Sequence, residues 1–265
     1  MPERSPDYSA IALAYDDRYR ANPLAGVGQA LTSLAQPRAC RRVLEVGCGT
    51  GRWLELLRPQ CGIVIGLDLS IDMLRQAVRA RHACPPGRVV PLLVRGCGDC
   101  LPFADGAFDL VFCVNALHHF GRPREFISEA HRLLAPGGVV AIIGMDPRER
   151  SSADWIYRYF EGTRESDLAR FPSWAEVEDW MIADGFTDLE QRPVECIHDP
   201  QVGREILSNP FLEKHASSQL ALLSDETYAD GVRRIEAAIA EAEARGEAVT
   251  FLMDVALAMV SGRKP

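Results

Sequence analysis

The sequence predicts an α/β fold, in which a doubly wound and mostly parallel sheet is covered by helices on both faces. Three observations lead to this prediction: strand-like apolar runs alternate with helical ones, a glycine-rich turn follows the first apolar run, and an acidic residue ends the second. Alternating strands and helices favour right-handed crossovers and therefore parallel strands. The chain has 265 residues, of which 47% are hydrophobic, enough for one large α/β core.

The elements of the first part of the chain follow from the spacing of their apolar residues. Strands are expected at 43–47, 63–68, 89–94, 108–114 and 138–144. Helices are expected at 9–20, 24–34, 52–57, 71–81 and 123–134. Strand and helix thus alternate along the chain up to Pro147.

Beyond Pro147 the pattern changes. The charged stretch that follows contains several aromatic residues, and 174–185 predicts a helix that ends at a glycine cap. Residues 148–185 therefore either cover an active site or seat a surface helix on the core. Two further strands are expected at 188–197 and 248–260, with a helical insertion at 198–247 between them that serves as a lid, a dimer surface or packing.

Composition excludes several kinds of partner. The formal net charge of −8 disfavours nucleic acid, which requires a basic surface to displace counterions. No apolar run approaches the about 20 residues of a membrane span, and the first residues have no apolar signal-peptide core. We therefore expect a cytoplasmic protein without a membrane partner.

Eight cysteines in a chain of this kind are expected to be reduced thiols. Cys97 and Cys100 form a C-x-x-C pair that suits a redox couple or half of a zinc site. No second pair follows at metal-ligand spacing, so no metal is predicted. A thiolate cluster could hold a soft element such as arsenic, but the spacing of the cysteines does not favour this.

The glycine-rich turn and the acid after it predict an adenosine site. Gly47, Gly49 and Gly51 let the backbone turn sharply and approach a ligand, and Asp68 at the end of the next strand can accept both ribose hydroxyls. The glycine spacing is not the G-x-G-x-x-G of a dinucleotide site. Glu45, two residues before Gly47, would repel a pyrophosphate and attract an ammonium group. The ligand that satisfies both acids is S-adenosylmethionine.

These residues make the chain resemble the class I S-adenosylmethionine-dependent methyltransferases, in particular the small-molecule branch related to ubiquinone and menaquinone methyltransferases. The resemblance continues in Gly98-Asp-Cys-Leu-Pro-Phe103, in 108–115 and in Leu133-Leu-Ala-Pro-Gly-Gly138. It covers residues 10–147 well and the remainder only by architecture.

The resemblance implies a Rossmann-like, seven-stranded sheet whose last strand is antiparallel. It also implies a single methyltransferase domain over 1–265, with N-terminal helices at 1–36 and a cofactor-binding core at 37–147. The resemblance also implies further cofactor contacts. Tyr15 and Arg20 would fold over the cofactor, and Leu69 and Met73 would flank its adenine. Asp99 and Cys100 would bind the adenine edge, and the backbone carbonyl of Asn115 would accept from the methionine ammonium.

The expected activity is in-line transfer of a methyl group to a small-molecule acceptor at O, N, C or S. Holding the acceptor opposite the leaving sulfur provides most of such catalysis. His118, in the pair His118-His119, could take a proton from the acceptor or only shape the pocket. The alternatives are a nicotinamide-dependent oxidoreductase and a non-catalytic S-adenosylmethionine-binding regulator. A homodimer is a possible assembly.

Overall fold

The computed structural model describes residues 12, 15–17, 19, 22–36, 41–82 and 90–265. These residues form two compact units, which we describe separately. The sheet unit consists of Leu24–Met145, Pro172–Glu195 and Leu257–Pro265. The helical unit consists of Met1–Pro23, Asp146–Phe171 and Cys196–Ala256.

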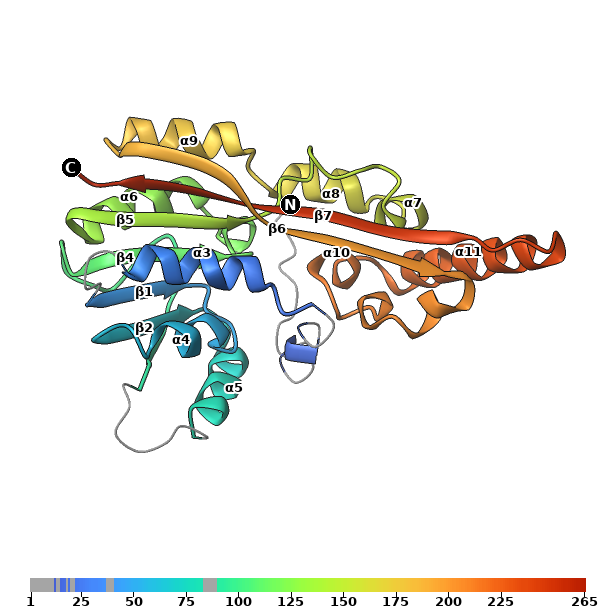
Figure 1. The fold of residues 1–265 in the computed structure, drawn as a ribbon, viewed down its shortest axis with the longest axis horizontal. Coiled ribbons are helices and arrows are strands. Elements are labelled where there is room, and N and C mark those ends of the chain that lie inside the picture. The colour runs from blue at the N-terminus through green and yellow to red at the C-terminus, as the bar shows by residue number, and fades with distance from the viewer. Residues whose placement is uncertain (1–11, 13–14, 18, 20–21, 37–40, 83–89) are drawn as a thin grey trace. The chain divides into compact units, whose positions relative to one another are not determined.

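The described residues form a sheet of seven strands in the order β3-β2-β1-β4-β5-β7-β6 (Figure 1). The strands are β1 (Arg42–Val46), β2 (Ile63–Asp68), β3 (Leu92–Arg95), β4 (Phe108–Val114), β5 (Leu134–Gly144), β6 (Thr187–Val202) and β7 (Thr250–Arg263). The pairs β1–β2, β2–β3, β1–β4 and β4–β5 are parallel, and β5–β7 is antiparallel. This confirms the predicted mostly parallel sheet with an antiparallel last strand.

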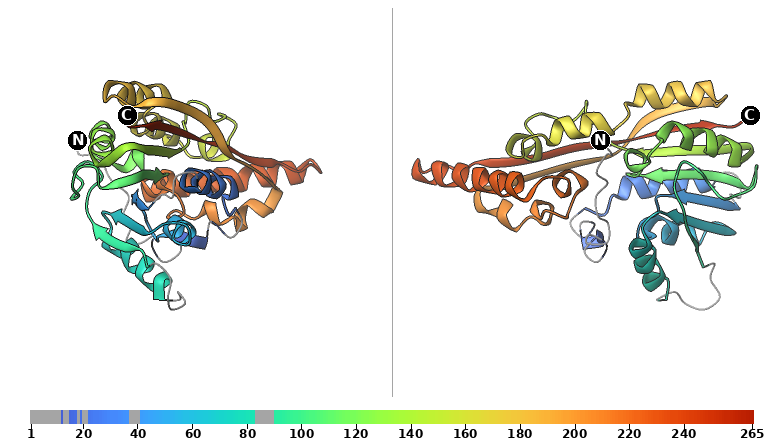
Figure 2. Two further views of the ribbon diagram at one scale, coloured as in Figure 1. Left: turned by 60° about the vertical axis from the view of Figure 1, so that its left-hand side comes forward. Right: turned by 180° about the vertical axis from the view of Figure 1, so that it is seen from behind.

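Helices cover both faces of this sheet (Figures 1 and 2). In the sheet unit they are α3 (Ala25–Ala35), α4 (Arg52–Leu57), α5 (Ile71–His82), α6 (Pro123–Leu133), α9 (Trp174–Ala183) and the short 3₁₀ helix η3 (Leu117–His119). Each α-helix begins and ends close to its prediction. Local signals explain two of the starts: proline occupies the first turn of α6, and Ser173 and Glu176 form a capping box at α9.

One large cluster of the sheet unit's core lies between the sheet and the α6 and α9 helices. Phe126 and Ile127 of α6 are fully buried, as are Val177 and Met181 of α9. They pack in one cluster with strand residues such as Val111. Burying a large apolar side chain stabilises a fold by about 1.5–3 kcal/mol, so this cluster holds the strand ends in a constant position.

The helical unit contains α7 (Trp155–Tyr159), α8 (Thr163–Arg170), α10 (Ser218–Ala221), α11 (Asp225–Ala244) and the 3₁₀ helices η1 (Tyr15–Asp17), η4 (Gly203–Ser208) and η5 (Pro210–Leu212). Trp155 and Phe160 are fully buried there. A Cβ on Gly231 of α11 would lie 2.3 Å from the Phe160 ring, so this glycine allows close packing. The aromatic residues after Pro147 thus form a core, and the cover role of 148–185 stays a prediction.

The helical unit also contains buried charged pairs. Arg150 pairs with Asp154 at 2.8 Å, with side chains that are 3% and 0% exposed. Asp167, also fully buried, accepts from Arg170 at 2.7 Å and from the Tyr157 hydroxyl at 2.8 Å. Removing one partner of such a pair leaves an uncompensated buried charge, which costs about 3–5 kcal/mol.

Some boundaries differ from their predictions. β6 extends beyond the expected 188–197, and β7 begins at Thr250 rather than 248 and ends at Arg263 rather than 260. Both strands end later than predicted because ladder pairing accommodates polar residues that lower strand propensity. β5 begins at Leu134 rather than 138, and a register shift against β4 absorbs the Pro-Gly-Gly segment. The expected helix 9–20 falls mostly outside the described residues. No described helix is both long and apolar enough to cross a membrane.

Gly66 of β2 provides a test of this packing. A Cβ at this position would lie 2.5 Å from Leu54 Cδ1 and 2.7 Å from Cys48 Sγ. We expect Gly66→Ala to lower the free energy of unfolding by about 1–3 kcal/mol, the usual cost of overpacking, as measured by denaturant titration. Gly121→Ala is the control, because its Cβ would meet only an Asp99 oxygen at 3.9 Å. Equal stability of the two variants would contradict the packing described.

Candidate functional site

The candidate site begins at the loop after β1, where the chain adopts left-handed backbone conformations. Gly47, Gly49 and Gly51 have φ angles of 75°, 53° and 81°, which L-residues with side chains rarely adopt. A Cβ on Gly47 would also lie 2.5 Å from the Ala116 Cβ. Glycine is therefore required here by conformation and by space. Gly51 ends the loop as the N-cap of α4.

Backbone hydrogen bonds fasten this loop to the end of β2. The amides of Gly47 and Cys48 donate to the Leu67 carbonyl at 2.7 and 3.0 Å. The Gly49 amide donates to an Asp68 carboxylate oxygen at 2.8 Å, and the Ser70 amide donates to the other oxygen at 2.8 Å. The predicted ribose-binding acid and the predicted glycine loop are thus brought together.

Two acids lie side by side beneath the loop. Glu45 is 1% exposed, and its Oε2 atom has no hydrogen-bond partner among the described residues. Burial, and then the neighbouring Asp68, raise the pKa of Glu45 well above its ordinary value. Burial also raises the pKa of Asp68, although the backbone donors act in the opposite direction. Glu45 is therefore a buried acid with one oxygen that no donor satisfies among the described residues.

The end of β4 contributes Asn115, whose φ of 51° is left-handed. Asparagine tolerates this conformation better than most residues. The Asn115 amide donates to the Ile143 carbonyl of β5 at 2.8 Å, which fixes the turn at the strand end. The rings of His118 and His119 follow directly in η3, with centroids 3.8 Å apart and both side chains half-buried.

The turn after β3 contains the predicted adenine-edge residues. Asp99 accepts from Arg122 Nε at 3.0 Å. A hydrogen bond from the Cys97 thiol lowers the pKa of Asp99, and the Arg122 guanidinium adds to this effect. Asp99 is therefore held ionised, and Cys100 beside it is exposed.

Phe120 connects this turn to the glycine loop. A Cβ on Gly98 would lie 2.9 Å from the Phe120 ring, and one on Gly47 would lie 3.5 Å from the same ring. Neither Phe120 nor Arg122 was predicted from the sequence. The only available signal was their place directly after the His118-His119 pair, because an exposed arginine and one aromatic residue are common in any chain.

The remaining predicted residues have different environments. Leu69 is 63% exposed directly after Asp68, whereas Met73 is 2% exposed and lies in the core. Tyr15 lies in the helical unit, with its ring centroid 6.2 Å from that of Tyr19. Arg20 lies outside the described residues. Among the described residues, no three His, Cys, Asp or Glu side chains gather in an arrangement that could hold a metal ion.

Comparisons with known proteins identify the family. Residues 44–142 match a family model described as a methyltransferase domain. The demethylmenaquinone methyltransferase of Thermus thermophilus is 31% identical over 163 residues, which are 58% of this chain and 71% of that protein. YcgJ of Bacillus subtilis, described as an uncharacterised methyltransferase, is 24% identical over 193 residues, 71% of this chain and 76% of that protein.

Solved structures agree with this fold. The crystal structure of YcgJ has a TM-score of 0.58 at 21% identity and covers 91% of this chain and 98% of that one. The Haemonchus contortus phosphoethanolamine N-methyltransferase 2, in complex with S-adenosylmethionine, has a TM-score of 0.61 at 17% identity and covers 97% of this chain and 57% of that one. Together with the glycine loop and its acids, these similarities show that the chain is an enzyme and belongs to the class I S-adenosylmethionine-dependent methyltransferase family.

Proposed function

We propose that this enzyme transfers a methyl group from S-adenosylmethionine to a small-molecule acceptor, at an O, N, C or S atom, by in-line displacement. The proposal depends on the loop of three left-handed glycines, which is hydrogen-bonded to Asp68. Near it lies Glu45, a buried acid whose Oε2 atom has no hydrogen-bond partner among the described residues. The names of two similar proteins support a small acceptor, since they specify demethylmenaquinone and phosphoethanolamine. The acidic composition of the chain supports the same choice.

The residues of the loop fit this cofactor, which when bound supplies a methyl group on an electrophilic sulfonium. The three glycines would let the backbone approach the methionine and ribose parts. Asp68 accepts from Gly49 and Ser70 in the structure. A carboxylate has about four lone-pair sites, so Asp68 keeps acceptor capacity for the ribose hydroxyls.

Glu45 would provide the negative charge that the amino-acid end of the cofactor requires. Its Oε2 atom lacks a donor among the described residues, which is costly for a buried polar atom. A nearby ammonium group, directly or through water, would relieve that cost. Glu45 would also orient the glycine loop. The carbonyl of Asn115 would accept from the same ammonium.

Adenine would lie toward the turn after β3. Asp99 would accept from the adenine amino group, the Cys100 backbone would contact the ring edge, and Leu69 and Met73 would flank the ring. Since Leu69 is 63% exposed, covering it with an adenine would bury apolar surface. Tyr15 and Arg20 would meet the cofactor carboxylate.

His118 would accept a proton from the acceptor, with the second role of shaping the pocket. A neutral imidazole suits this task because the ordinary pKa of histidine is close to neutrality.

A nicotinamide-dependent oxidoreductase is disfavoured, because a buried Glu45 beside the loop would repel a pyrophosphate and the chain belongs to the methyltransferases. A non-catalytic regulator would bind the cofactor without transferring its methyl group.

Substitution of Asp68 tests the cofactor site. We expect Asp68→Asn to weaken binding of S-adenosylhomocysteine at least about tenfold, because a hydrogen bond to a charged group contributes about 1.5–3 kcal/mol. Titration calorimetry measures this change. Asp105→Asn, at a side chain that is 79% exposed, is the matched control and should bind normally. Undiminished binding by Asp68→Asn would refute the assignment.

Substitution of Glu45 tests the buried charge. Because its pKa is raised in the folded protein, the folded state holds this proton more tightly than the unfolded chain does. Stability from this group is therefore present at low pH and is lost as the pH rises above the ordinary glutamate value of about 4.3. Glu45→Gln should stabilise the ligand-free protein at neutral pH, because glutamine keeps the shape of the side chain and removes the buried charge beside Asp68.

Thermal unfolding followed by circular dichroism at neutral and acidic pH measures this effect. The advantage of Glu45→Gln should shrink toward acidic pH, where glutamate is protonated in both states. The same variant should bind S-adenosylhomocysteine more weakly than the wild type. A stability difference that does not depend on pH would argue against a buried charge.

Label transfer tests the reaction. We expect methyl label from S-adenosylmethionine to appear in the small-molecule fraction of a cell extract that is incubated with the protein. His118→Ala should lower this rate by about 10²–10⁴-fold, the usual contribution of a general base, and leave S-adenosylhomocysteine binding unchanged. Label found only in protein or nucleic acid would contradict a small acceptor, and no transfer by a cofactor-binding protein would favour the regulator.

A further inference from the structure

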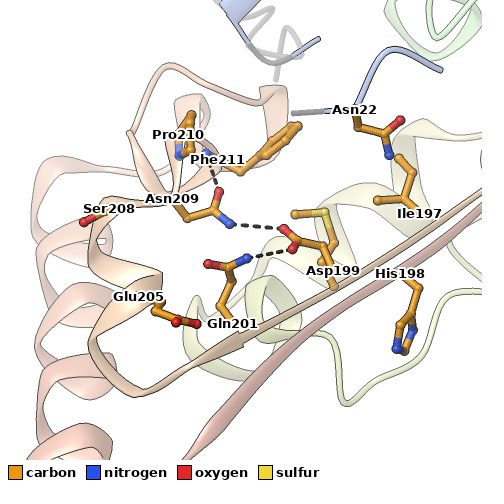
Figure 3. Close-up of a pocket in the computed structure, with 11 residues that line it drawn as sticks. Asn22, Ile197, His198, Asp199, Gln201, Glu205, Ser208, Asn209, Pro210 and Phe211 are labelled. Atoms are coloured by element: carbon orange, nitrogen blue, oxygen red, sulfur yellow. Dashed lines mark hydrogen bonds between the residues drawn. The ribbon is translucent and has the colours of Figure 1, made fainter. Parts of the chain in front are cut away.

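A cavity of about 330 Å³ lies within the helical unit, and none of the residues assigned to the cofactor is among those that line it (Figure 3). It lies between the second half of β6, the η4–η5 segment and Met253 of β7. Its volume is at the lower end of the about 300–1,000 Å³ that small-molecule sites occupy. The cavity is therefore large enough for a ligand with a single ring.

Strand periodicity forms one wall of this cavity. Ile197, Asp199 and Gln201 alternate along β6, so their side chains lie on the same face of the strand, and all three are half-buried. Figure 3 shows Asp199 between the amides of Gln201 and Asn209, while His198 points away. A one-residue shift in register would remove Asp199 from the cavity.

Two neutral amides hold the Asp199 carboxylate. Gln201 Nε2 donates to one oxygen at 2.6 Å, and Asn209 Nδ2 donates to the other at 3.3 Å. Asn209 is itself 8% exposed and accepts from the Phe211 amide at 2.9 Å, so its position is fixed. Both amides orient the carboxylate without cancelling its charge, and spare lone pairs remain on its oxygens.

The other lining residues determine which charge and which shape a ligand of this cavity can have. Among the described lining residues there is a second carboxylate, Glu205, and no lysine or arginine. The apolar part consists of Ile197, Pro210, Phe211 and Met253. The aromatic face of Phe211 can also attract a cation, by about 0.5–2 kcal/mol depending on desolvation.

We propose that this cavity is a binding site for a small organic ammonium with an apolar body. The ammonium group donates to Asp199 and to the free Gln201 carbonyl oxygen, and the apolar body lies against Phe211 and Met253. No residue of this cavity is assigned to the cofactor, so the inference does not depend on the proposed reaction.

Ligand-observed NMR and calorimetry on the full chain test the proposal with three probes of one shape. We expect 2-phenylethylammonium to bind, 2-phenylethanol to bind at least about tenfold more weakly, and phenylacetate not to bind, because only the first carries a positive charge. Equal binding of ammonium and phenylacetate would overturn the proposal, as would the absence of ammonium binding at millimolar concentration.

Substitutions locate the site. Asp199→Asn should reduce ammonium affinity at least about tenfold, to the level of the alcohol, because it removes the charge and keeps the shape. Glu241→Gln removes the same charge from an exposed position on α11 and should leave binding unchanged. Retained ammonium affinity in Asp199→Asn would overturn the assignment.

A second variant covers the case in which Asp199→Asn does not fold, which its thermal unfolding and S-adenosylhomocysteine binding reveal. Phe211→Leu keeps apolar volume but lacks the aromatic face, so it should weaken the ammonium several-fold and the alcohol little. An equal effect on both probes would overturn the proposed role of the ring.

Discussion

The hydrogen bond from the Gly49 amide to the Asp68 carboxylate is the contact on which the functional site depends. At 2.8 Å it links the tip of the loop after β1 to the tip of β2. The parallel pairing of Val46 with Leu67 brings these two strand ends to the same edge of the sheet. Without this carboxylate, a loop with three left-handed glycines would have many backbone conformations open to it. Asp68 thus shapes the loop, and we propose that it also binds the ligand.

The same edge concentrates negative charge. Glu45 lies close enough to Asp68 for the Asp68 charge to raise the pKa of Glu45, and burial raises the pKa of both acids. Such an arrangement is unfavourable in the empty protein and becomes favourable when a cation or hydroxyl donors arrive. Two acids repel a negatively charged pyrophosphate and attract a cation. A site of this kind would therefore select a cationic nucleoside by charge as well as by shape.

The helical unit combines an aromatic core with buried ion pairs. Its core combines the rings of Trp155 and Phe160 with buried ion pairs such as Arg150–Asp154. Buried pairs contribute little net stability, but they penalise any rearrangement that separates them. The amide-held Asp199 is a further case of polar groups fixed in place, and there the charge faces a cavity. The unit thus has a rigid framework beside a polar, partly open wall.

The sequence by itself determined the sheet, the order of its elements and the loop with its acids. These features depend on local patterns: apolar periodicity, glycine at left-handed positions, and an acid directly after a strand. Strand ends were accurate where apolar runs end abruptly, as at Asp68, and less so in β6, where polar residues continue the ladder. The roles of the individual cofactor residues stay predictions.

Only the tertiary structure decided the division into two units, the unpartnered state of Glu45 Oε2, the Phe120 ring across Gly47 and Gly98, and the cavity around Asp199. Each of these depends on residues that are distant in sequence and meet only after the chain has folded. Periodicity shows which face of an element is apolar, but it does not show which atoms meet that face.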